Sequence, residues 1–431
     1  MNITWADTLN QLLDQCRTNE SMKGVAAGVV FSDGSTWSSA SGYHGLNNLS
    51  KDYLYDIGSN TKSMVATIIL QMEEEGKLSI DDTLYQFLQP IPNVSYGITL
   101  KQLLSHRSGV FSYTEHANFS GEINTYDKKF WHPDSILVHF MSPQKFSPGS
   151  SFEYSNTNYL LLGKVVEVID NKALNVVLRD RIFDPIGIDS IYLDQYDPYS
   201  LVKTGAWLSS SNYFDEDFIS FMSSAWAAGG VVSTPKDFAK YTKQLFSGQL
   251  FGAASLQKMQ QGTSIGGGGT YGLGAIKWNY KGKTYLGHGG TTLQNSEMEY
   301  SVSSDFSLII MNIDYGFYNE TARTKLKFID LLEYIEDQQA SIGFVESIQS
   351  KFEFETFPNP SSDIMNIEFK EQNENEVFTL EIRDLTGKII MKQQLDKSSY
   401  ILKKADVGTG VFVLSLFADG KWVENKKLVF N

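Results

Sequence analysis

Hydrophobic and polar positions repeat with two different periods over most of the chain. In several stretches apolar residues recur every three or four positions, which predicts helices with one buried face. The predicted helices cover residues 5–17, 61–76, 160–169 and 236–246. Strand-like runs at 24–31 and 36–42, joined by a Ser-Asp-Gly turn, lie between the first two helices. We therefore expect a mixed α/β (α+β) body.

The pattern changes at about residue 350. Beyond it no helical period appears, and short apolar runs alternate with turn residues. The predicted strands cover residues 364–369, 377–382, 388–395, 400–402, 411–417 and 422–430. Evenly spaced short strands are typical of a small β-sandwich. We divide the chain into a main domain (1–345), a linker (346–352) and a C-terminal all-β domain (353–431).

Composition and charge narrow the possible partners. Hydrophobic residues make up 42% of the 431 residues and charged residues 20%, the balance of a soluble globular protein. The net charge of −14 disfavours nucleic acid and anionic membrane surfaces as partners. No apolar run approaches the ~20 residues of a transmembrane segment. The first residues also lack the basic and apolar regions of a signal peptide.

The sequence offers no pattern for a cofactor or a metal. Cys16 is the sole cysteine, which excludes an intrachain disulfide and a cysteine-built metal site, and it falls on the apolar face of the first helix. The histidines lack metal-binding spacing, and the glycine run at 266–269 lacks the register of a phosphate-binding loop. We expect no cofactor.

A serine and a lysine stand three residues apart at the start of the helix predicted at 61–76. Ser59 and Lys62 would share one helical face, so the hydroxyl and the amine can meet. A serine needs a neighbouring base to become a nucleophile. The positive end of the helix dipole would lower the pKa of Lys62 toward that role. Alone, this spacing is common and also fits a solvated helix start.

Tyr154 and Asn156 stand before an apolar helix, and His288 stands within a glycine-rich run. Tyr154 is a candidate base if Lys62 favours its phenolate, and Asn156 could bind a substrate amide. His288 is followed by Gly289 and Gly290, which would let a substrate backbone approach closely. Taken singly, they fit a buried aromatic in a loop and a structural histidine.

Together, Ser-x-x-Lys, Tyr-Ser-Asn and His-Gly-Gly in this order resemble the penicillin-recognising serine hydrolases, which include class C β-lactamases, D-alanyl-D-alanine carboxypeptidases and related esterases. The likeness covers roughly residues 5–345. It extends to residues 24–29, 100–109, 227–234 and 271–274. The resemblance implies a β-lactamase/transpeptidase-like antiparallel sheet flanked by helices, with a helical subdomain.

The resemblance also implies a role for each matched residue. Ser59 would be acylated while Lys62 and Tyr154 move its proton, and the sequence does not decide which of them is the base. The backbone N–H groups of Ser59 and Thr291 would form the oxyanion hole. Residues 288–290 would line the substrate site, where β-lactamases carry Lys-Thr-Gly.

Two features need separate treatment. Lys203-Thr204-Gly205 spells the β-lactamase triplet, but it precedes the Ala-Ala-Gly-Gly stretch at 227–230, so His288 is the match and this triplet is a decoy. Residues 291–300 depart from the Pro-Gly-Phe-like turn usual in the family. Because that segment would border the acyl-binding pocket, substrate preference does not carry over.

The C-terminal domain resembles a type IX secretion sorting domain, through Phe357-Pro358-Asn359-Pro360 and Gly410-Val411-Phe412. That likeness implies a secreted or cell-surface protein, a secretion machinery as partner and a signal peptide that once preceded the chain. The alternative is an ordinary interaction sandwich.

The leading hypothesis is a serine hydrolase that cleaves esters or D-amino-acid amides and peptides through an acyl-enzyme, acting on small-molecule or peptide substrates. A true β-lactamase is the nearest alternative, disfavoured because His288 replaces the lysine. From another class, a catalytically silent binding protein could use the same fold.

Overall fold

The computed structural model describes residues 3–125, 128–208, 211–213, 218–346, 354–369, 378–384, 388–395, 399–418 and 421–430. They form two compact units, divided between Glu333 and Tyr334. The long helix α11 (Tyr318–Glu346) crosses this division. Beyond residue 346 the predicted linker lies outside the described residues, and the exact domain boundaries stay a prediction.

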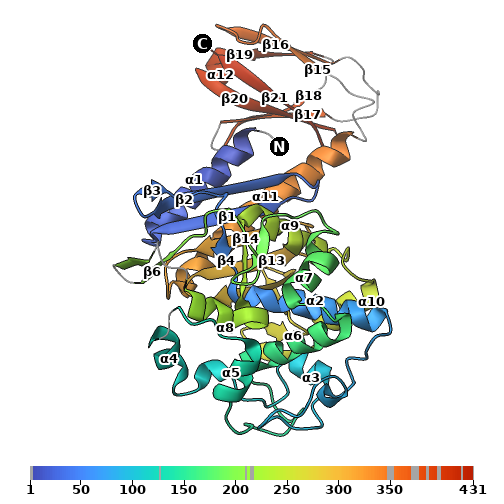
Figure 1. Cartoon of the computed structure of the whole chain (residues 1–431). Coiled ribbons are helices and arrows are strands. Elements are labelled where there is room, and N and C mark those ends of the chain that lie inside the picture. Colours follow the sequence, from blue (N-terminus) through green and yellow to red (C-terminus); the bar gives the residue numbers. More distant parts are fainter. Residues whose placement is uncertain are drawn as a thin grey trace. The chain divides into compact units, whose positions relative to one another are not determined.

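An antiparallel sheet forms the centre of the first unit (Figure 1). In its described part it has nine strands in the order β3-β2-β1-β14-β13-β12-β11-β10-β9. The strands are β1 (Gly24–Val30), β2 (Thr36–His44), β3 (Asn47–Asn48), β9 (Thr263–Gly266), β10 (Gly269–Tyr271), β11 (Ile276–Tyr280), β12 (Lys283–Thr291), β13 (Asn295–Ser301) and β14 (Ser307–Asn312). The predicted pair 24–31 and 36–42 is confirmed as β1 and β2.

Helices cover both faces of this sheet (Figure 1). Successive residues of a strand point to opposite faces. Gly28 of β1 faces helix α9 (Pro235–Phe246), because a Cβ at Gly28 would lie 2.2 Å from the Pro235 carbonyl oxygen. Trp37 is paired with Val29 and contacts Phe328 of α11, with ring centroids 5.9 Å apart. Burial on both faces explains why every residue of β1 is buried.

The other α-helices described in this unit include α2, which begins directly after the turn that carries Ser59. They are α1 (Ile3–Asn19), α2 (Thr61–Glu74), α3 (Leu100–Leu104), α4 (Phe119–Thr125), α5 (Pro133–His139), α6 (Asn156–Asp170), α7 (Leu174–Leu178), α8 (Ile219–Gly229) and α10 (Ala253–Gln260). The four predicted helices are confirmed as α1, α2, α6 and α9, and Cys16 is buried on α1. Helix α6 begins four residues before the predicted start, because its first turn is polar and carries no apolar period.

A small second sheet leads the chain into the site. Strand β4 (Tyr55–Asp56) pairs with β8 (Val231–Ser233), which also pairs with β5 (Ile191–Leu193). A hairpin of β6 (Ala206–Leu208) and β7 (Ser211–Tyr213) follows the decoy triplet. Because β4 ends at Asp56, the small sheet holds the turn that presents Ser59.

The second unit contains two antiparallel sheets around one apolar core, as the predicted sandwich requires. The sheets are β15-β16-β19 and β18-β17-β20-β21. Met365 of the first sheet and Leu380 and Leu414 of the second sheet are among the core residues. The strands are β15 (Phe354–Phe357), β16 (Ile364–Phe369), β17 (Phe378–Arg383), β18 (Ile389–Leu395), β19 (Ser399–Lys403), β20 (Gly410–Ala418) and β21 (Lys421–Phe430). All six predicted strands are present. Lys388 lies outside β18, and Val377 is among the residues that the structure does not describe. Strand β15 and the one-turn helix α12 (Lys404–Val407) were not predicted.

Candidate active site

Ser59 lies in a single 3₁₀ turn (Gly58–Asn60) directly before α2. Gly58 has a φ of +52°, and a Cβ at this position would lie 2.6 Å from the backbone nitrogen of Thr291. Only glycine permits both the left-handed backbone and this close approach. The serine side chain is partly exposed, while both flanking residues are buried. The turn therefore leaves the Ser59 side chain partly exposed while its backbone packs closely against that of Thr291.

Lys62 is completely buried beneath this serine. Its Nζ lies 2.9 Å from Ser59 Oγ, 2.8 Å from Asn156 Oδ1 and 2.5 Å from the carbonyl oxygen of Ala228. Among the residues that the structure describes, no carboxylate pairs with this amine. Burial lowers the pKa of Lys62 well below its ordinary value. Desolvation therefore produces the lowering that the sequence suggested through the helix dipole.

Tyr154 stands two residues before α6, with its ring against Lys62. The amine lies 4.9 Å from the ring centroid. The hydroxyl oxygen is buried and makes no hydrogen bond of regular geometry within the described residues. Burial raises the pKa of Tyr154, and an interaction with the Ser59 hydroxyl opposes the rise. The phenol, and not the phenolate, is thus favoured in this environment.

His288, on β12, is buried at one end of a chain of hydrogen bonds. Its Nε2 lies 3.0 Å from the hydroxyl of Tyr271, which lies 3.1 Å from Nε2 of His106. The backbone N–H of Ser155 donates to Nδ1 of His106, so the His106 proton sits on Nε2 and is donated to Tyr271. Tyr271 in turn donates to His288, whose Nδ1 proton reaches the Gly289 carbonyl oxygen at 2.6 Å.

This order of donors leaves His288 neutral and both of its ring nitrogens occupied. Burial is the main cause that lowers the pKa of His288 to about 4. Its ring centroid lies 6.3 Å from that of Tyr154, so it borders the site without contributing a fixed positive charge.

The end of β12 carries the predicted residues Gly289, Gly290 and Thr291 past the serine turn. A Cβ at Gly290 would lie 2.0 Å from the Ile57 carbonyl oxygen. The backbone segments around Ser59 and Thr291 therefore meet side by side. The residues predicted from the three triplets come together here, from the turn and first residues of α2, from the start of α6 with the two residues before it, and from β12. Sequence reasoning missed Ala228 as an acceptor and His106 and Tyr271 as partners, although all three lie in stretches that matched the family.

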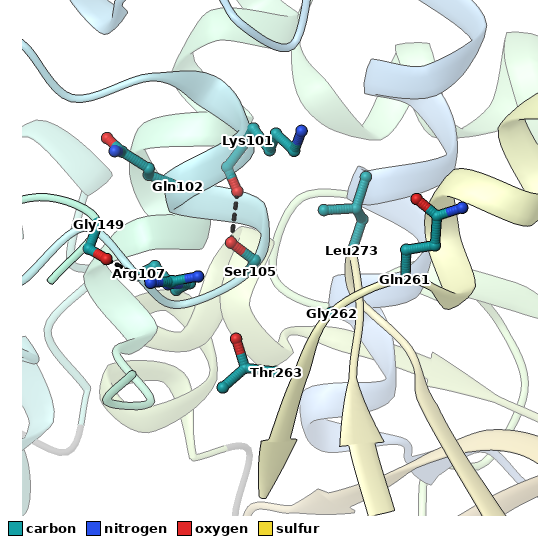
Figure 2. A pocket seen from close by; sticks show the side chains of 9 residues that line it. All are labelled: Lys101, Gln102, Ser105, Arg107, Gly149, Gln261, Gly262, Thr263 and Leu273. Atoms are coloured by element: carbon teal, nitrogen blue, oxygen red, sulfur yellow. Dashed lines mark hydrogen bonds between the residues drawn. The ribbon is translucent and has the colours of Figure 1, made fainter. Parts of the chain in front are cut away.

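A separate pocket of about 300 Å³ is lined by residues of α3 and of the segments around Gly149 and Gly262 (Figure 2). It contains none of the predicted site residues. Arg107, in the turn after α3, lines it and donates a hydrogen bond to the Gly149 carbonyl oxygen. The full lining is Lys101, Gln102, Ser105, Arg107, Gly149, Gln261, Gly262, Thr263 and Leu273.

No group of histidine, cysteine, aspartate or glutamate among the described residues could hold a metal ion.

Comparison with known proteins accounts for most of the chain. The family model described as Beta-lactamase matches residues 9–316. The chain belongs to the beta-lactamase family. The sheet and helices of the first unit are thus the β-lactamase/transpeptidase-like fold. Residues 355–431 match the secretion system C-terminal sorting domain, which indicates an exported, secreted or cell-surface protein. No helix in the described part of the chain is long and apolar enough to cross a membrane.

Individual relatives of this family member are 27–28% identical to it over the residues that align. A penicillin-binding protein of Bacillus subtilis is 28% identical over 220 residues, covering 51% of this chain and 52% of its own length. A teichoic acid D-alanine hydrolase of Staphylococcus aureus is 27% identical over 203 residues, covering 46% and 47%. The chain thus spans about half the length of these curated relatives. The crystal structure of a D-stereospecific amidohydrolase from Streptomyces sp. is 25% identical, with a TM-score of 0.64 over 72% of this chain and 96% of that one.

Proposed function

We propose that this protein is a serine hydrolase that cleaves ester or amide bonds through an acyl-enzyme on Ser59. One observation carries the proposal: a completely buried lysine amine, with no carboxylate partner among the described residues, lies 2.9 Å from the serine hydroxyl. A structural lysine would gain nothing from such a position, because burying an unpaired ammonium is costly. A neutral amine beside a serine is a general base.

The hydrogen bonds around Lys62 fit a neutral amine. Such an amine has two N–H donors and one lone pair. Asn156 Oδ1 and the Ala228 carbonyl oxygen can only accept, and they take the two donors. The amide nitrogen of Asn156 faces Thr114 Oγ1 at 3.1 Å, which fixes the orientation of the amide. The lone pair is then left for the Ser59 proton.

The reaction follows from this arrangement. As Ser59 Oγ forms a bond to the substrate carbonyl carbon, its proton passes to Lys62, and the carbonyl electrons move onto the oxygen. The backbone N–H groups of Ser59 and Thr291 would stabilise that oxyanion. Collapse expels the leaving group, which receives a proton from the Tyr154 phenol, and the phenol is restored from Lys62. Water then attacks the acyl-enzyme by the same groups.

We infer that small esters and D-amino-acid amides are preferred to penicillins. A neutral His288 provides no cation for the carboxylate of a β-lactam. D-amino-acid chemistry also appears in the names of two relatives, the teichoic acid D-alanine hydrolase and the D-stereospecific amidohydrolase.

We further infer that the C-terminal domain is of the type IX kind. It would bring the protein to a secretion machinery that carries it across the outer membrane and removes the tail. A signal peptide would precede the chain.

The test compares Ser59, in the turn before α2, with Ser63, in the first turn of α2. Ser59→Ala should lower kcat for p-nitrophenyl acetate by on the order of 10⁶, because nucleophile and base act as a unit. Ser63→Ala is the matched control, since its hydroxyl bonds the Asn60 carbonyl oxygen at 2.7 Å and not Lys62. It should keep turnover within threefold. Circular dichroism checks that both variants fold, and folded Ser59→Ala with activity within tenfold of the parent would exclude the proposal.

A further inference from the structure

A second polar network includes Asp56, in the strand that leads into the serine turn. Asp56, three residues before Ser59, is buried with its Oδ1 3.3 Å from the ammonium of Lys203. The same ammonium lies 2.6 Å from Asp194. Burial alone would lower the pKa of Lys203, but the two carboxylates outweigh burial and raise it. Lys203 is therefore a permanent cation between two acids.

This network continues into the segment that follows Thr291. The hydroxyl of Thr292 donates to Asp56 Oδ2 at 2.9 Å, and the backbone N–H of Asp56 donates to Gln294 Oε1 at 3.2 Å. The amide nitrogen of Gln294 lies 2.9 Å from Thr204 Oγ1 and 3.1 Å from the carbonyl oxygens of Thr204 and Gly205. Thr292 and Gln294 are both buried.

The decoy triplet is also attached directly to the strand that precedes the serine. Leu54 N–H donates to the Val202 carbonyl oxygen at 2.8 Å, and Thr204 N–H donates to the Leu54 carbonyl oxygen at 2.8 Å. Three distant segments, around residues 54–56, 202–205 and 292–294, are thus joined by buried hydrogen bonds. The two features that the catalytic triplets left unexplained, the decoy and the unusual turn after Thr291, supply two of these segments.

We propose that Asp56, Thr292 and Gln294, supported by Lys203, are positioning residues for the oxyanion hole. We call these four residues the Asp56 network. It joins the two segments whose backbone N–H groups must point at one oxyanion, since Asp56 is three residues from Ser59 and Thr292 is next to Thr291. The inference rests on the proposed function, because it assumes acyl transfer at Ser59.

The expected effect falls on the transition state. Oxyanion donors act only within about 2.7–3.1 Å of the developing charge, and a misplacement of about 1 Å from a remote mutation can cost about 10²-fold. The side chains of Thr292 and Gln294 make their hydrogen bonds to Asp56, Thr204 and Gly205, and none of these bonds goes to Ser59, Lys62 or Tyr154. Loosening it should therefore lower kcat and leave KM nearly unchanged.

The experiment removes one hydroxyl without changing charge or size. Thr292→Val should lower kcat for p-nitrophenyl acetate between tenfold and a hundredfold, with KM within threefold of the parent. A boronic acid, which mimics the tetrahedral oxyanion, should bind more weakly by the same factor. Thr292→Ser restores the hydroxyl and should return kcat to within threefold. Thr284→Val is the matched control at the other end of β12, where the hydroxyl bonds exposed Asn279, and it should match the parent.

Every outcome decides the proposal. Folded Thr292→Val with kcat and boronate affinity within twofold of the parent overturns it, as does Thr292→Ser failing to restore a lost rate. If Thr292→Val does not fold, Gln294→Met is judged by the same criteria on the opposite side of Asp56. A folded parent that turns over no ester, or a parent activity that survives in Ser59→Ala, refutes the proposed function instead, so the two failures are distinguishable.

Discussion

Replacing Lys62 with methionine should change how stability depends on pH. The pKa of Lys62 is lowered by burial, so between its folded-state pKa and about 10.5 the folded protein lacks a proton that the unfolded chain binds. In that range the parent's free energy of unfolding rises with pH through this group and falls as pH decreases. Methionine fills a similar volume and does not titrate.

The magnitude follows from one proton. The difference in unfolding free energy, parent minus Lys62→Met, should increase with pH between pH 7.5 and 9.5, with an upper limit of about 1.4 kcal/mol for each pH unit, the slope for one whole proton. Lost bonds to Asn156 and Ala228 shift the variant's stability at all pH values, but they do not change this slope. The prediction therefore concerns the slope and not the absolute stability.

Urea unfolding at pH 7.5, 8.5 and 9.5 measures the difference. Tryptophan fluorescence reports on the catalytic unit, because Trp422 alone of the seven tryptophans lies beyond residue 333. Lys101→Met, at an exposed lysine, controls for removal of a positive charge. A difference that stays constant across the three pH values would mean that Lys62 keeps its proton on folding, and it would refute Lys62 as the resting base.

Three further results are expected. Tyr154→Phe should lower kcat by about 10²–10⁴-fold for a D-alanyl anilide. The loss should be smaller for p-nitrophenyl acetate, because its leaving group needs no proton. Equal losses for the two substrates would contradict the role of Tyr154 as the acid. The parent should hydrolyse the ester and the anilide with a higher kcat/KM than nitrocefin, and nitrocefin as its best substrate would favour the β-lactamase alternative. His288→Lys should raise kcat/KM for nitrocefin about fivefold or more, because a fixed charge at 4 Å is worth roughly 4 kcal/mol at an effective dielectric of 20 before desolvation. A chain ending after Glu346 should remain folded by circular dichroism and keep its kcat, and a monodisperse but inactive product would place part of the site in the C-terminal domain.

Much of the fold and of the site could be predicted because its signals are local. Helix α2 has a clear apolar period, and Thr234-Pro235 marks the start of α9, where Thr234 Oγ1 accepts from Asp237 N–H at 3.4 Å. The serine and lysine lie one helical turn apart, so their contact needs only local geometry. Helix α11 was not predicted, because between Glu320 and Asp337 its apolar residues are interspersed with charged ones.

The parts that escaped prediction depend on contacts between distant segments. The choice between Lys62 and Tyr154 as base depends on burial, which a sequence does not contain. The role of Lys203 depends on Asp56, in β4, and on Asp194, directly after β5, and the sequence does not show that they meet. The charge state of His288 likewise depends on Tyr271 and His106, which reach it only in the folded protein.

The most direct test of the central claim is mass spectrometry after incubation with a fluorophosphonate. Peptide mapping should place a single phosphonyl adduct on the peptide that contains Ser59, with no adduct in Ser59→Ala and full labelling in Ser63→Ala. Labelling should also become faster as pH rises through the range in which Lys62 loses its proton. A folded parent protein that acquires no adduct, or acquires it on another residue, would contradict the assignment of Ser59 as the nucleophile.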